Sequence, residues 1–372
     1  MCGIVGLFLK DKTLEPHLGE MLTEMLVTMT DRGPDSAGIA IYGNEHDTQK
    51  KLTVQSDNGA EDFATLATDL GAVIGADVSL NRKDTHAVLN IPSNSIDAAR
   101  TALRELRPEL RVMSAGDTIE IYKEVGLPSE VAARFDVSEM SGTHGIGHTR
   151  MATESAVTTM GAHPFSTGPD QCLVHNGSLS NHNSLRRKLR REGIYIETEN
   201  DTEVAAAYLT WRMKQGLNLG EALEKSLDDL DGFFNFVVGT KTGFGVIRDP
   251  IACKPAVMAE TDQYVAFGSE YRAMVNLPGK VLGVFAGGII WWTAISHYLV
   301  GSRMAASLWN GVMGGWTAVL TALIALQIFS PAVARRAGLI AALTTTVRRL
   351  RPVSAWRLVP MLRRITVWFT RG

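Results

Sequence analysis

The second residue of the chain is a candidate nucleophile. The sequence begins Met1-Cys2-Gly3, so removal of the initiator methionine would place Cys2 at the N-terminus. An N-terminal cysteine carries a thiol and, on the same residue, an α-amine with an ordinary pKa of about 7.7–8.0. That amine can accept the thiol proton and later return it to a leaving group. The apolar run after Cys2 stops at Leu9, which is too short for a secretory signal, so we expect a buried strand there.

Four short segments further along the chain could supply the other groups that such chemistry needs. They are Arg32-Gly33-Pro34-Asp35-Ser36, Gly147-His148-Thr149-Arg150-Met151-Ala152-Thr153, Val174-His175-Asn176-Gly177-Ser178-Leu179-Ser180-Asn181 and Asn200-Asp201-Thr202-Glu203. Each segment alone is also explained by a turn, a strand end or a helix cap.

In this order behind an N-terminal cysteine, the segments resemble the class II, or N-terminal nucleophile, glutamine amidotransferase domain. Three more segments fit the same pattern, at 161–165, 248–250 and 267–270. The resemblance extends over 2–277, and the overall layout is most similar to stand-alone amidotransferase subunits related to glutamate synthase, including those of N-methylglutamate synthase systems. The sequence departs from the pattern at Met151, where many members carry an aromatic residue.

The resemblance implies a catalytic role for three residues. The Cys2 thiolate would attack the side-chain carbonyl of glutamine and form a thioester, and its α-amine would move the proton. The amide NH2 of Asn176 and the backbone N–H of Gly177 would donate to the developing oxyanion. Arg32 and Asp35 are expected mainly to organise the loop around the nucleophile.

The resemblance also implies how glutamine would be recognised. Arg150 offers a planar fork that can hold an α-carboxylate through two parallel hydrogen bonds, which lysine cannot do. Asp201 would supply the anion for the α-ammonium group, although it also suits the start of a helix. Thr153 and His163 match positions that line the same pocket.

Neither a metal nor a cofactor is expected. We interpret three histidines in or next to predicted strands as core residues rather than as metal ligands: His144, His148 and His175. The three cysteines are far apart and in no metal-like spacing, which is typical of a reduced, intracellular protein. No phosphate-binding loop is present, and the net charge of -2 gives no reason to expect nucleic acid.

Alternating strand and helix patterns predict an α+β fold, which for this family is a four-layer αββα sandwich over 2–277. We expect strands at 3–9, 38–42, 142–152, 171–174, 233–239, 244–248 and 264–268, and helices from Leu18 and at 183–191, 201–214 and 220–230. Residues 43–141 are expected to be an insertion that forms a small α+β unit. Its predicted elements are strands at 85–91, 110–114 and 118–123 and a helix at 95–106.

The C-terminal segment 278–372 differs in composition from the rest. All 39 acidic residues lie at or before Glu270, and the stretches 281–302 and 304–334 carry no charge. One interpretation is a membrane hairpin within 281–331, with spans at 281–300 and 312–329 and an arginine-rich tail that keeps the catalytic part cytoplasmic. The other is a change of reading frame, in which part of 281–293 still completes the sheet.

Three function hypotheses follow. The first is a glutaminase subunit that releases ammonia for a separate, glutamate-synthase-like subunit. The second is a free-standing N-terminal-nucleophile amidohydrolase, although Arg150 together with Asp201 favours a free amino acid as its substrate. The third is a non-catalytic, membrane-associated subunit, which retention of Met1 would favour.

Overall fold

The computed structural model describes residues 2–43, 45, 47–152, 156–279, 284–285 and 368–369. Thr153 and nearly all of the segment 278–372 lie outside these residues, including the whole expected span 312–329 and all of the span 281–300 except 284–285. The chain divides into two compact units, and the described residues belong to the first, which comprises 1–285 and 366–372. Within the described ranges, no helix has the length and apolar character needed to cross a bilayer.

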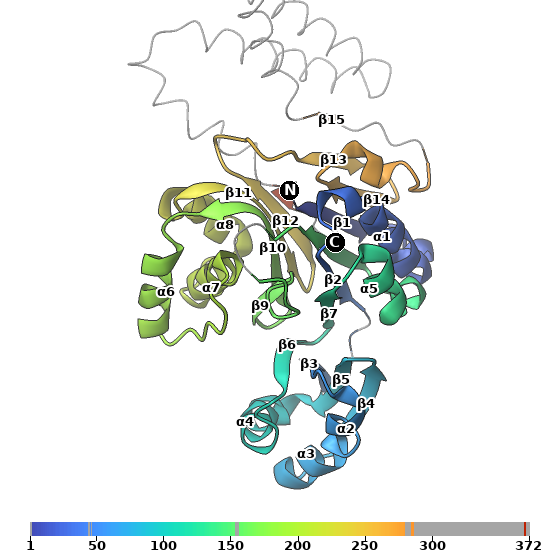
Figure 1. Ribbon diagram of the computed structural model, residues 1–372, viewed down its shortest axis with the longest axis vertical. Helices are drawn as coiled ribbons and strands as arrows, with labels where there is room; N and C mark the ends of the chain where they lie inside the picture. Colours follow the sequence, from blue (N-terminus) through green and yellow to red (C-terminus); the bar gives the residue numbers. More distant parts are fainter. Residues whose placement is uncertain are drawn as a thin grey trace, which may run out of the picture. The chain divides into compact units, whose positions relative to one another are not determined.

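The first large sheet is antiparallel and seven-stranded (Figure 1). Its strands, in spatial order, are β15 (Val284–Phe285), β13 (Val257–Glu260), β14 (Tyr264–Gly268), β1 (Gly3–Leu9), β8 (His144–Arg150), β2 (Ser36–Tyr42) and β7 (Ile119–Val125). The strand that starts beside the candidate nucleophile is therefore central, with β14 and β8 as its neighbours. Strand β15, which pairs with β13 over two residues, lies inside the segment 281–293 that was expected to complete the sheet if the reading frame had changed.

The second large sheet is also antiparallel and has five strands. In spatial order these are β16 (Trp368–Phe369), β12 (Gly243–Arg248), β11 (Gly232–Thr240), β10 (Gln171–Leu179) and β9 (Phe165–Gly168). The predicted strand 171–174 is too short, because β10 continues to Leu179. Asn176 and Gly177 therefore lie within the strand and not in a turn after it.

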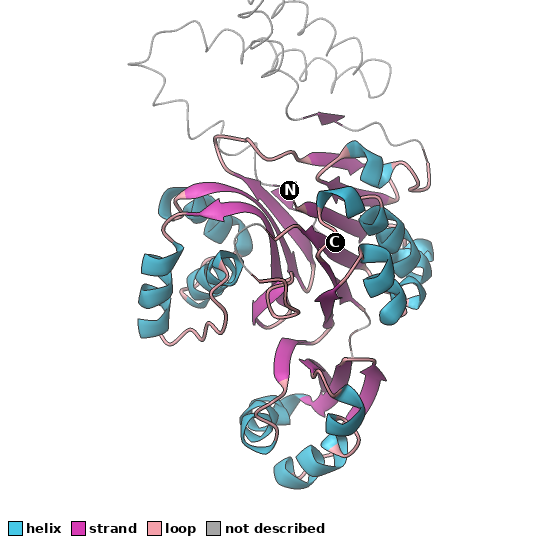
Figure 2. Cartoon of the chain, in the orientation of Figure 1, coloured by secondary structure: helices cyan, strands magenta, loops and turns pink. Residues whose placement is uncertain are grey.

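Helices cover the outer faces of the two sheets (Figure 2). On the first sheet lie α1 (Leu18–Val27) and α5 (Pro128–Arg134), and on the second lie α6 (His182–Arg191), α7 (Asp201–Lys214) and α8 (Leu219–Asp229). A third apolar cluster fills the space between the sheets and includes Ile4, Ile146, Val174 and Val237. The order of layers is helix, sheet, sheet, helix, as expected for the sandwich.

A separate four-stranded sheet lies within residues 49–116. It is built from β3 (Gln49–Gln55), β4 (Ser79–Lys83), β5 (His86–Pro92) and β6 (Arg111–Gly116), with α2 (Gly59–Asp62), α3 (Leu66–Ile74) and α4 (Ile96–Leu106). This unit is smaller than the expected insertion of 43–141, because β7 pairs with β2 in the first large sheet and α5 packs against α1. Single-turn helices complete the described elements: η1 (Lys12–His17), η2 (Thr30–Arg32), η3 (Ser93–Ser95), η4 (Val137–Glu139) and η5 (Tyr271–Met274).

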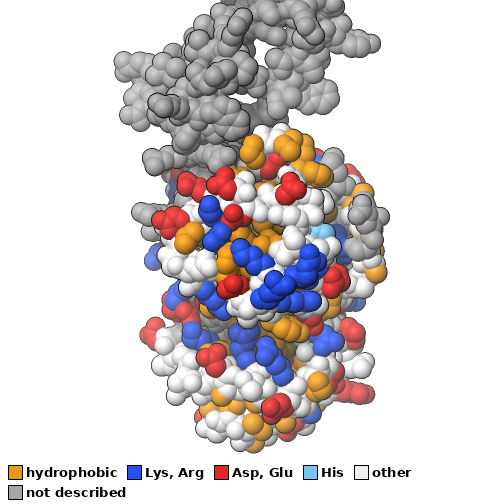
Figure 3. Space-filling model, turned by 90° about the vertical axis from the view of Figure 1, so that its left-hand side faces the viewer, with side chains coloured by type: hydrophobic (Ala, Val, Ile, Leu, Met, Phe, Trp, Pro, Cys, Tyr) orange, Lys and Arg blue, Asp and Glu red, His pale blue; other side chains and the backbone are white. Residues whose placement is uncertain are grey.

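Helix α6 is buried on one side and basic on the other. Leu185 and Leu189 pack into the core of the second sheet. Arg187, Lys188 and Arg191 are exposed and form no ion pair within the part of the chain that the structure describes. Lysine and arginine side chains gather on the face of the molecule that carries α6 (Figure 3). Their charge keeps this outer layer hydrated.

Asp170 joins the separate sheet to the sandwich. This buried carboxylate accepts hydrogen bonds from the backbone N–H groups of Asp117, Thr118 and Ile119 at 2.8, 2.8 and 3.1 Å. It adopts the left-handed conformation with φ of 48°, which aspartate tolerates better than most residues. The chain between β6 and β7 is therefore held against the turn between β9 and β10.

Replacing Asp170 by asparagine should lower the free energy of unfolding. Asparagine keeps the size and the left-handed preference of aspartate, but its NH2 group would face the N–H of Asp117 and leave it unpaired. We expect a loss of about 1–3 kcal/mol, measured by urea denaturation. The control is Asp77→Asn at an exposed position, for which the change should stay within about 0.5 kcal/mol. Equal stability of the two variants would contradict this role for Asp170.

Candidate active site

The alternation of side chains along β1 and β10 brings two of the predicted catalytic residues to facing surfaces. Cys2 precedes β1 by one residue and has the same parity as Ile4, which belongs to the core between the sheets. Asn176 has the same parity as Val174, which belongs to the same core. The predicted nucleophile and the predicted oxyanion donor therefore come from different sheets and meet between them.

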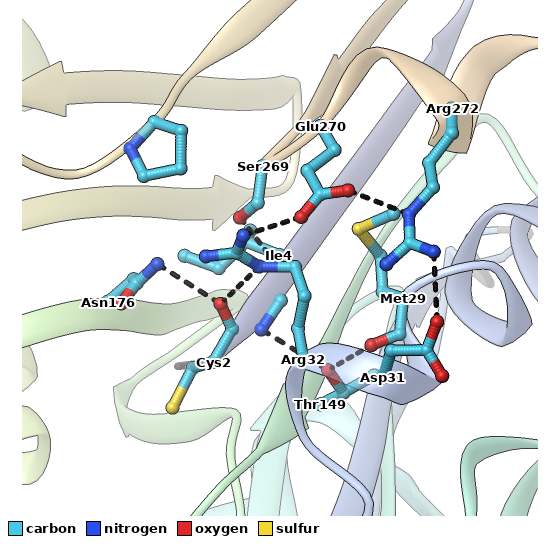
Figure 4. Close-up of polar contacts among 12 residues, drawn as sticks. Cys2, Ile4, Met29, Asp31, Arg32, Thr149, Asn176, Ser269, Glu270 and Arg272 are labelled. Atoms are coloured by element: carbon cyan, nitrogen blue, oxygen red, sulfur yellow. Dashed lines mark hydrogen bonds and ion pairs between the residues drawn. The ribbon is translucent and has the colours of Figure 1, made fainter.

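The backbone carbonyl of Cys2 is held from two sides (Figure 4). It accepts a hydrogen bond of 2.9 Å from Arg32 Nε and one of 3.1 Å from Asn176 Nδ2. An amide NH2 has two donors, so Asn176 keeps a second N–H after this bond. The next two residues of the chain are fixed as well, because Gly3 N–H donates to Thr149 Oγ1 and Ile4 N–H donates to Ser269 Oγ.

The backbone of Gly177 presents its N–H away from β11. Phe234 lies opposite Gly177. Its N–H donates to Asp249 Oδ1, and its carbonyl accepts a hydrogen bond from the backbone N–H of Asp249. Because hydrogen-bonded and non-hydrogen-bonded pairs alternate in antiparallel strands, Gly177 and Phe234 form a non-hydrogen-bonded pair. The position also requires glycine, since φ is 152° and a Cβ would lie 2.0 Å from the carbonyl oxygen of Phe233.

Asp35 fixes the chain that follows Arg150. Its Oδ2 accepts a 2.8 Å hydrogen bond from the backbone N–H of Ala152, and its own N–H donates to the carbonyl of Arg150. The carboxylate and the backbone of Asp35 therefore both bind the chain that flanks Met151.

Arg150 is buried at the end of β8 and contacts the loop that follows. Its Nη1 donates to the carbonyl of Ala156 at 3.3 Å, and a Cβ on Gly161 would lie 3.0 Å from the same atom. The carbonyl of Gly161 accepts from Asn200 Nδ2 at 3.5 Å. The loop around Gly161 therefore connects the guanidinium of Arg150 to the start of α7.

Asp201 is the first residue of α7. Asn200 caps the helix through its side chain, whereas the Oδ2 atom of Asp201 accepts a 2.9 Å hydrogen bond from the N–H of Leu179. Leu179 lies two residues after Gly177 on β10. The carboxylate is thus held beside the strand that carries Asn176 and Gly177, and its side chain is 23% exposed.

His163 is enclosed in a cluster of buried histidines. Its Nε2 bonds to Thr202 Oγ1 at 2.8 Å, and its ring stacks on that of His148 with 4.0 Å between centroids. His175 Nδ1 lies 3.2 Å from the same hydroxyl. Burial holds the pKa of His163 well below its ordinary value, so its ring is neutral. Among the described residues, no group of histidine, cysteine or acidic side chains is arranged to hold a metal ion.

Three residues that support this region were not predicted from the sequence. Thr202 bridges two of the buried histidines, Glu270 binds Arg32 Nη1 at 2.6 Å, and Lys123 donates from β7 to the carbonyls of Ala162 and Pro164. Burial lowers the pKa of Lys123 to about 8. Thr202 and Glu270 stood in quoted motifs without an assigned role, whereas Lys123 gave no signal beyond its place in a strand.

The buried histidines make the stability of the protein depend on pH. Burial lowers the pKa of His86 and His148 to about 3 and of His144 to about 4, and it also lowers the pKa of His163 and His175. The unfolded chain binds protons at these residues near pH 6.5, but the folded chain does not. Their contribution is therefore complete above pH 6.5 and decreases as the pH falls.

Between pH 7 and 5.5, each of His86, His144 and His148 should lower the free energy of unfolding by roughly 1 kcal/mol. Urea denaturation at the two pH values measures the total decrease. In the His86→Phe variant the new ring can pack against Tyr122 and Phe135. The decrease in the free energy of unfolding should then be smaller by the contribution of one histidine, roughly 1 kcal/mol. An equal decrease in the wild type and this variant would contradict the assignment.

Comparisons with known proteins identify the family. A family model described as a glutamine amidotransferase domain matches residues 148–276. The glutamine amidotransferase-like protein GlxB of Rhizobium meliloti (strain 1021) is 68% identical over 278 residues, which are 75% of this chain and 92% of that protein. A glutamine amidotransferase of Methanothermobacter thermautotrophicus is 37% identical over 280 residues, with 73% and 92% covered.

A solved structure shows the same fold. The structure titled as the allosteric regulatory enzyme of purine biosynthesis matches with a TM-score of 0.50 and 19% identity, and the match covers 76% of this chain. This chain spans 44% of that enzyme's length, so the match concerns the fold alone. The extent and identity of the match to GlxB, together with this fold and the N-terminal motifs, show that the chain belongs to the class II glutamine amidotransferases.

Proposed function

We propose that this protein is a glutaminase subunit that releases ammonia from glutamine through a thioester on Cys2 and delivers it to a separate synthase subunit. The observation that carries the proposal is the position of Cys2. Its carbonyl is bound by Arg32 and by Asn176, which belongs to the opposite sheet. A residue in an ordinary strand would not need side chains from two sheets to fix its carbonyl.

In the proposed reaction, the Cys2 α-amine takes the thiol proton after Met1 has been removed. The thiolate attacks the side-chain carbonyl carbon of glutamine, and the oxyanion that forms is stabilised by the second N–H of Asn176 and the N–H of Gly177. The ammonium form of the amine then protonates the leaving nitrogen, so that the carbon–nitrogen bond breaks and ammonia departs. Water hydrolyses the thioester and gives glutamate.

Recognition of the amino-acid end of glutamine is assigned to Arg150 and Asp201. The loop around Gly161 and the hydrogen bond to Leu179 hold the two opposite charges from different elements. Because His163 is buried and bonded to Thr202, we assign it a supporting role through α7 and not a direct contact with substrate. Thr153 remains a proposed pocket residue by the family pattern only.

A separate acceptor is supported by the extent of the relatives. The match to GlxB covers 92% of that protein, whereas a match to a glutamine–fructose-6-phosphate aminotransferase of Vibrio vulnificus covers 21% of the enzyme. GlxB thus has little length beyond the matched region, as expected of a stand-alone amidotransferase. A free-standing amidohydrolase is the second candidate, and a rate of glutamine hydrolysis that no synthase subunit raises would distinguish it.

The first experiment on this proposal tests the nucleophile. Intact-mass analysis should show that the mature protein lacks Met1, and an electrophilic diazoketone analogue of glutamine should add one mass increment on Cys2. Cys253 is the internal control because it is exposed, whereas Cys172 is buried. The Cys2→Ser variant should remain unlabelled. Labelling of Cys253 in place of Cys2 would sink the mechanism.

The second experiment separates substrate binding from chemistry. Arg150→Lys should raise the KM for glutamine about 10- to 150-fold, because one charged hydrogen bond of the pair is lost. Asn176→Ala should instead lower kcat roughly 10²- to 10³-fold with a smaller change in KM, because the donor acts on charge that forms in the transition state.

Two variants serve as matched controls for this experiment. Arg187→Lys, on the exposed face of α6, should leave both constants unchanged. Asn235→Ala removes the side-chain bonds to the carbonyls of Lys254 and Pro255 at the position opposite Asn176, without loss of a contact to Cys2. If Asn176→Ala changed only KM, its assignment to the oxyanion would be wrong.

A further inference from the structure

A chain of alternating charges leads from Cys2 to the protein surface. Arg32 Nε binds the carbonyl of Cys2, and Arg32 Nη1 binds Glu270 Oε1 at 2.6 Å. The other oxygen of Glu270 lies 2.7 Å from Arg272 Nε, and Arg272 Nη1 binds Asp31 at 3.1 Å. We call Arg32, Glu270, Arg272 and Asp31 the charge chain; it is drawn in Figure 4.

The members of the charge chain become more exposed with each step away from Cys2. The side chain of Arg32 is 9% exposed, that of Glu270 34%, that of Arg272 42% and that of Asp31 83%. Solvent screens an exposed charge more than a buried one, so the influence on Cys2 should decrease in the same order. Burial opposes ionisation of Glu270, but the hydrogen bond from Arg32 and the charge of Arg272 lower its pKa, so it is an anion at neutral pH.

The α-amine of Cys2 lies inside the range of these charges. Standard bond lengths place the amine nitrogen within about 3.6 Å of the carbonyl oxygen of the same residue. Since Arg32 Nε is 2.9 Å from that oxygen, the guanidinium and the amine are at most about 6.5 Å apart. A cation at this distance disfavours the ammonium form of the amine, and an anion behind the cation reduces the effect.

We propose that the charge chain sets the proton affinity of the Cys2 α-amine, which Arg32 lowers and Glu270 partly restores. The inference rests on the proposed function, in which the amine is the base for the thiol. It gives Glu270 and Arg272 a positioning and tuning role although neither contacts substrate. A neutral amine near pH 7 is the form that can take the thiol proton.

Other charged groups also face this region and are left unchanged by the tests below. They are the thiol of Cys2 itself, Arg150 and the neutral His148 on β8, and Asp35 before β2. His175 bonds to Thr202 on α7, and Asp201, also on α7, bonds to the N–H of Leu179. Their effects cancel in a comparison between variants, because each variant differs from the wild type in one member of the charge chain.

The experiment measures the acidic limb of the pH profile of kcat/KM for glutamine hydrolysis by the full chain. Glu270→Gln keeps an acceptor for Arg32 but removes the negative charge, so the limb should move to lower pH by about 0.5–1 unit. Arg272→Gln removes a positive charge, so the limb should move to higher pH by a smaller amount. Asp31→Asn should leave it within about 0.2 unit of the wild type.

The opposite signs separate tuning from loss of structure. A variant that merely loosens the loop would lower kcat without moving the limb, or would move it in the same direction for Glu270→Gln and Arg272→Gln. Either result overturns the proposal. Arg272→Lys, which keeps the charge, should restore the wild-type limb. Glu260→Gln is the control for removal of a carboxylate. Glu260 lies at the end of β13, is paired with Lys10 and is not part of the charge chain.

A second readout does not depend on activity. In Cys2→Ser protein that lacks Met1, the rate at which acetic anhydride acylates the α-amine at different pH values gives the pKa of the amine directly, with peptide mass spectrometry as the detector. The charge-chain variants in this background should shift that pKa with the same signs. Shifts without any glutaminase activity in the Cys2 protein would refute the proposed function alone; activity without shifts would refute the tuning alone. Retention of Met1 would refute both.

Discussion

The two hydrogen bonds to the carbonyl of Cys2 connect the halves of the sandwich at the point where chemistry is proposed. Arg32 reaches the oxygen from the side of the first sheet and Asn176 from the second. Both bonds are short only if the sheets keep a fixed separation, and the apolar cluster around Ile4 and Val174 provides it. The core between the sheets thus determines the distance between Cys2 and Asn176, the proposed nucleophile and oxyanion donor, and not merely the stability of the fold.

The remaining site residues are placed by backbone contacts. Asp35 holds the backbone on both sides of Met151, Asp201 is bonded to the N–H of Leu179, and the loop at Gly161 lies against Arg150. Backbone groups do not change with side-chain substitution, so such contacts keep the site in place while the surrounding surface varies. The two charges proposed to recognise glutamine are in this way held at β8, which ends at Arg150, and beside β10, which bonds to Asp201.

Much of this arrangement can be predicted from the sequence, and the exceptions have physical causes. Strands 3–9 and 264–268 and helix 201–214 have the predicted bounds because their apolar patterns are clear. Strand β10 was predicted too short because Asn176-Gly177 is a typical turn signal, which tertiary pairing with β11 overrides. Strand β3 was not predicted because it begins with the polar residues Gln49-Lys50-Lys51, which are typical of an exposed loop. In the structure Lys51 is buried and bonds to Glu120 on β7. The tuning of Cys2 by distant charges has no local signal at all.

The separate sheet of 49–116 has a consequence for how this family can vary. Tyr42 and Ile119 are direct partners across β2 and β7, so for the first large sheet everything between them is the connection of a β-hairpin. Lengthening a connection is inexpensive, at about 0.6 kcal/mol for each doubling. Residues 49–116 can therefore be lengthened, shortened or replaced during evolution without a change in the pairing of β2 with β7. The position of Cys2 beside β1, which is separated from β2 by β8, is then also unchanged.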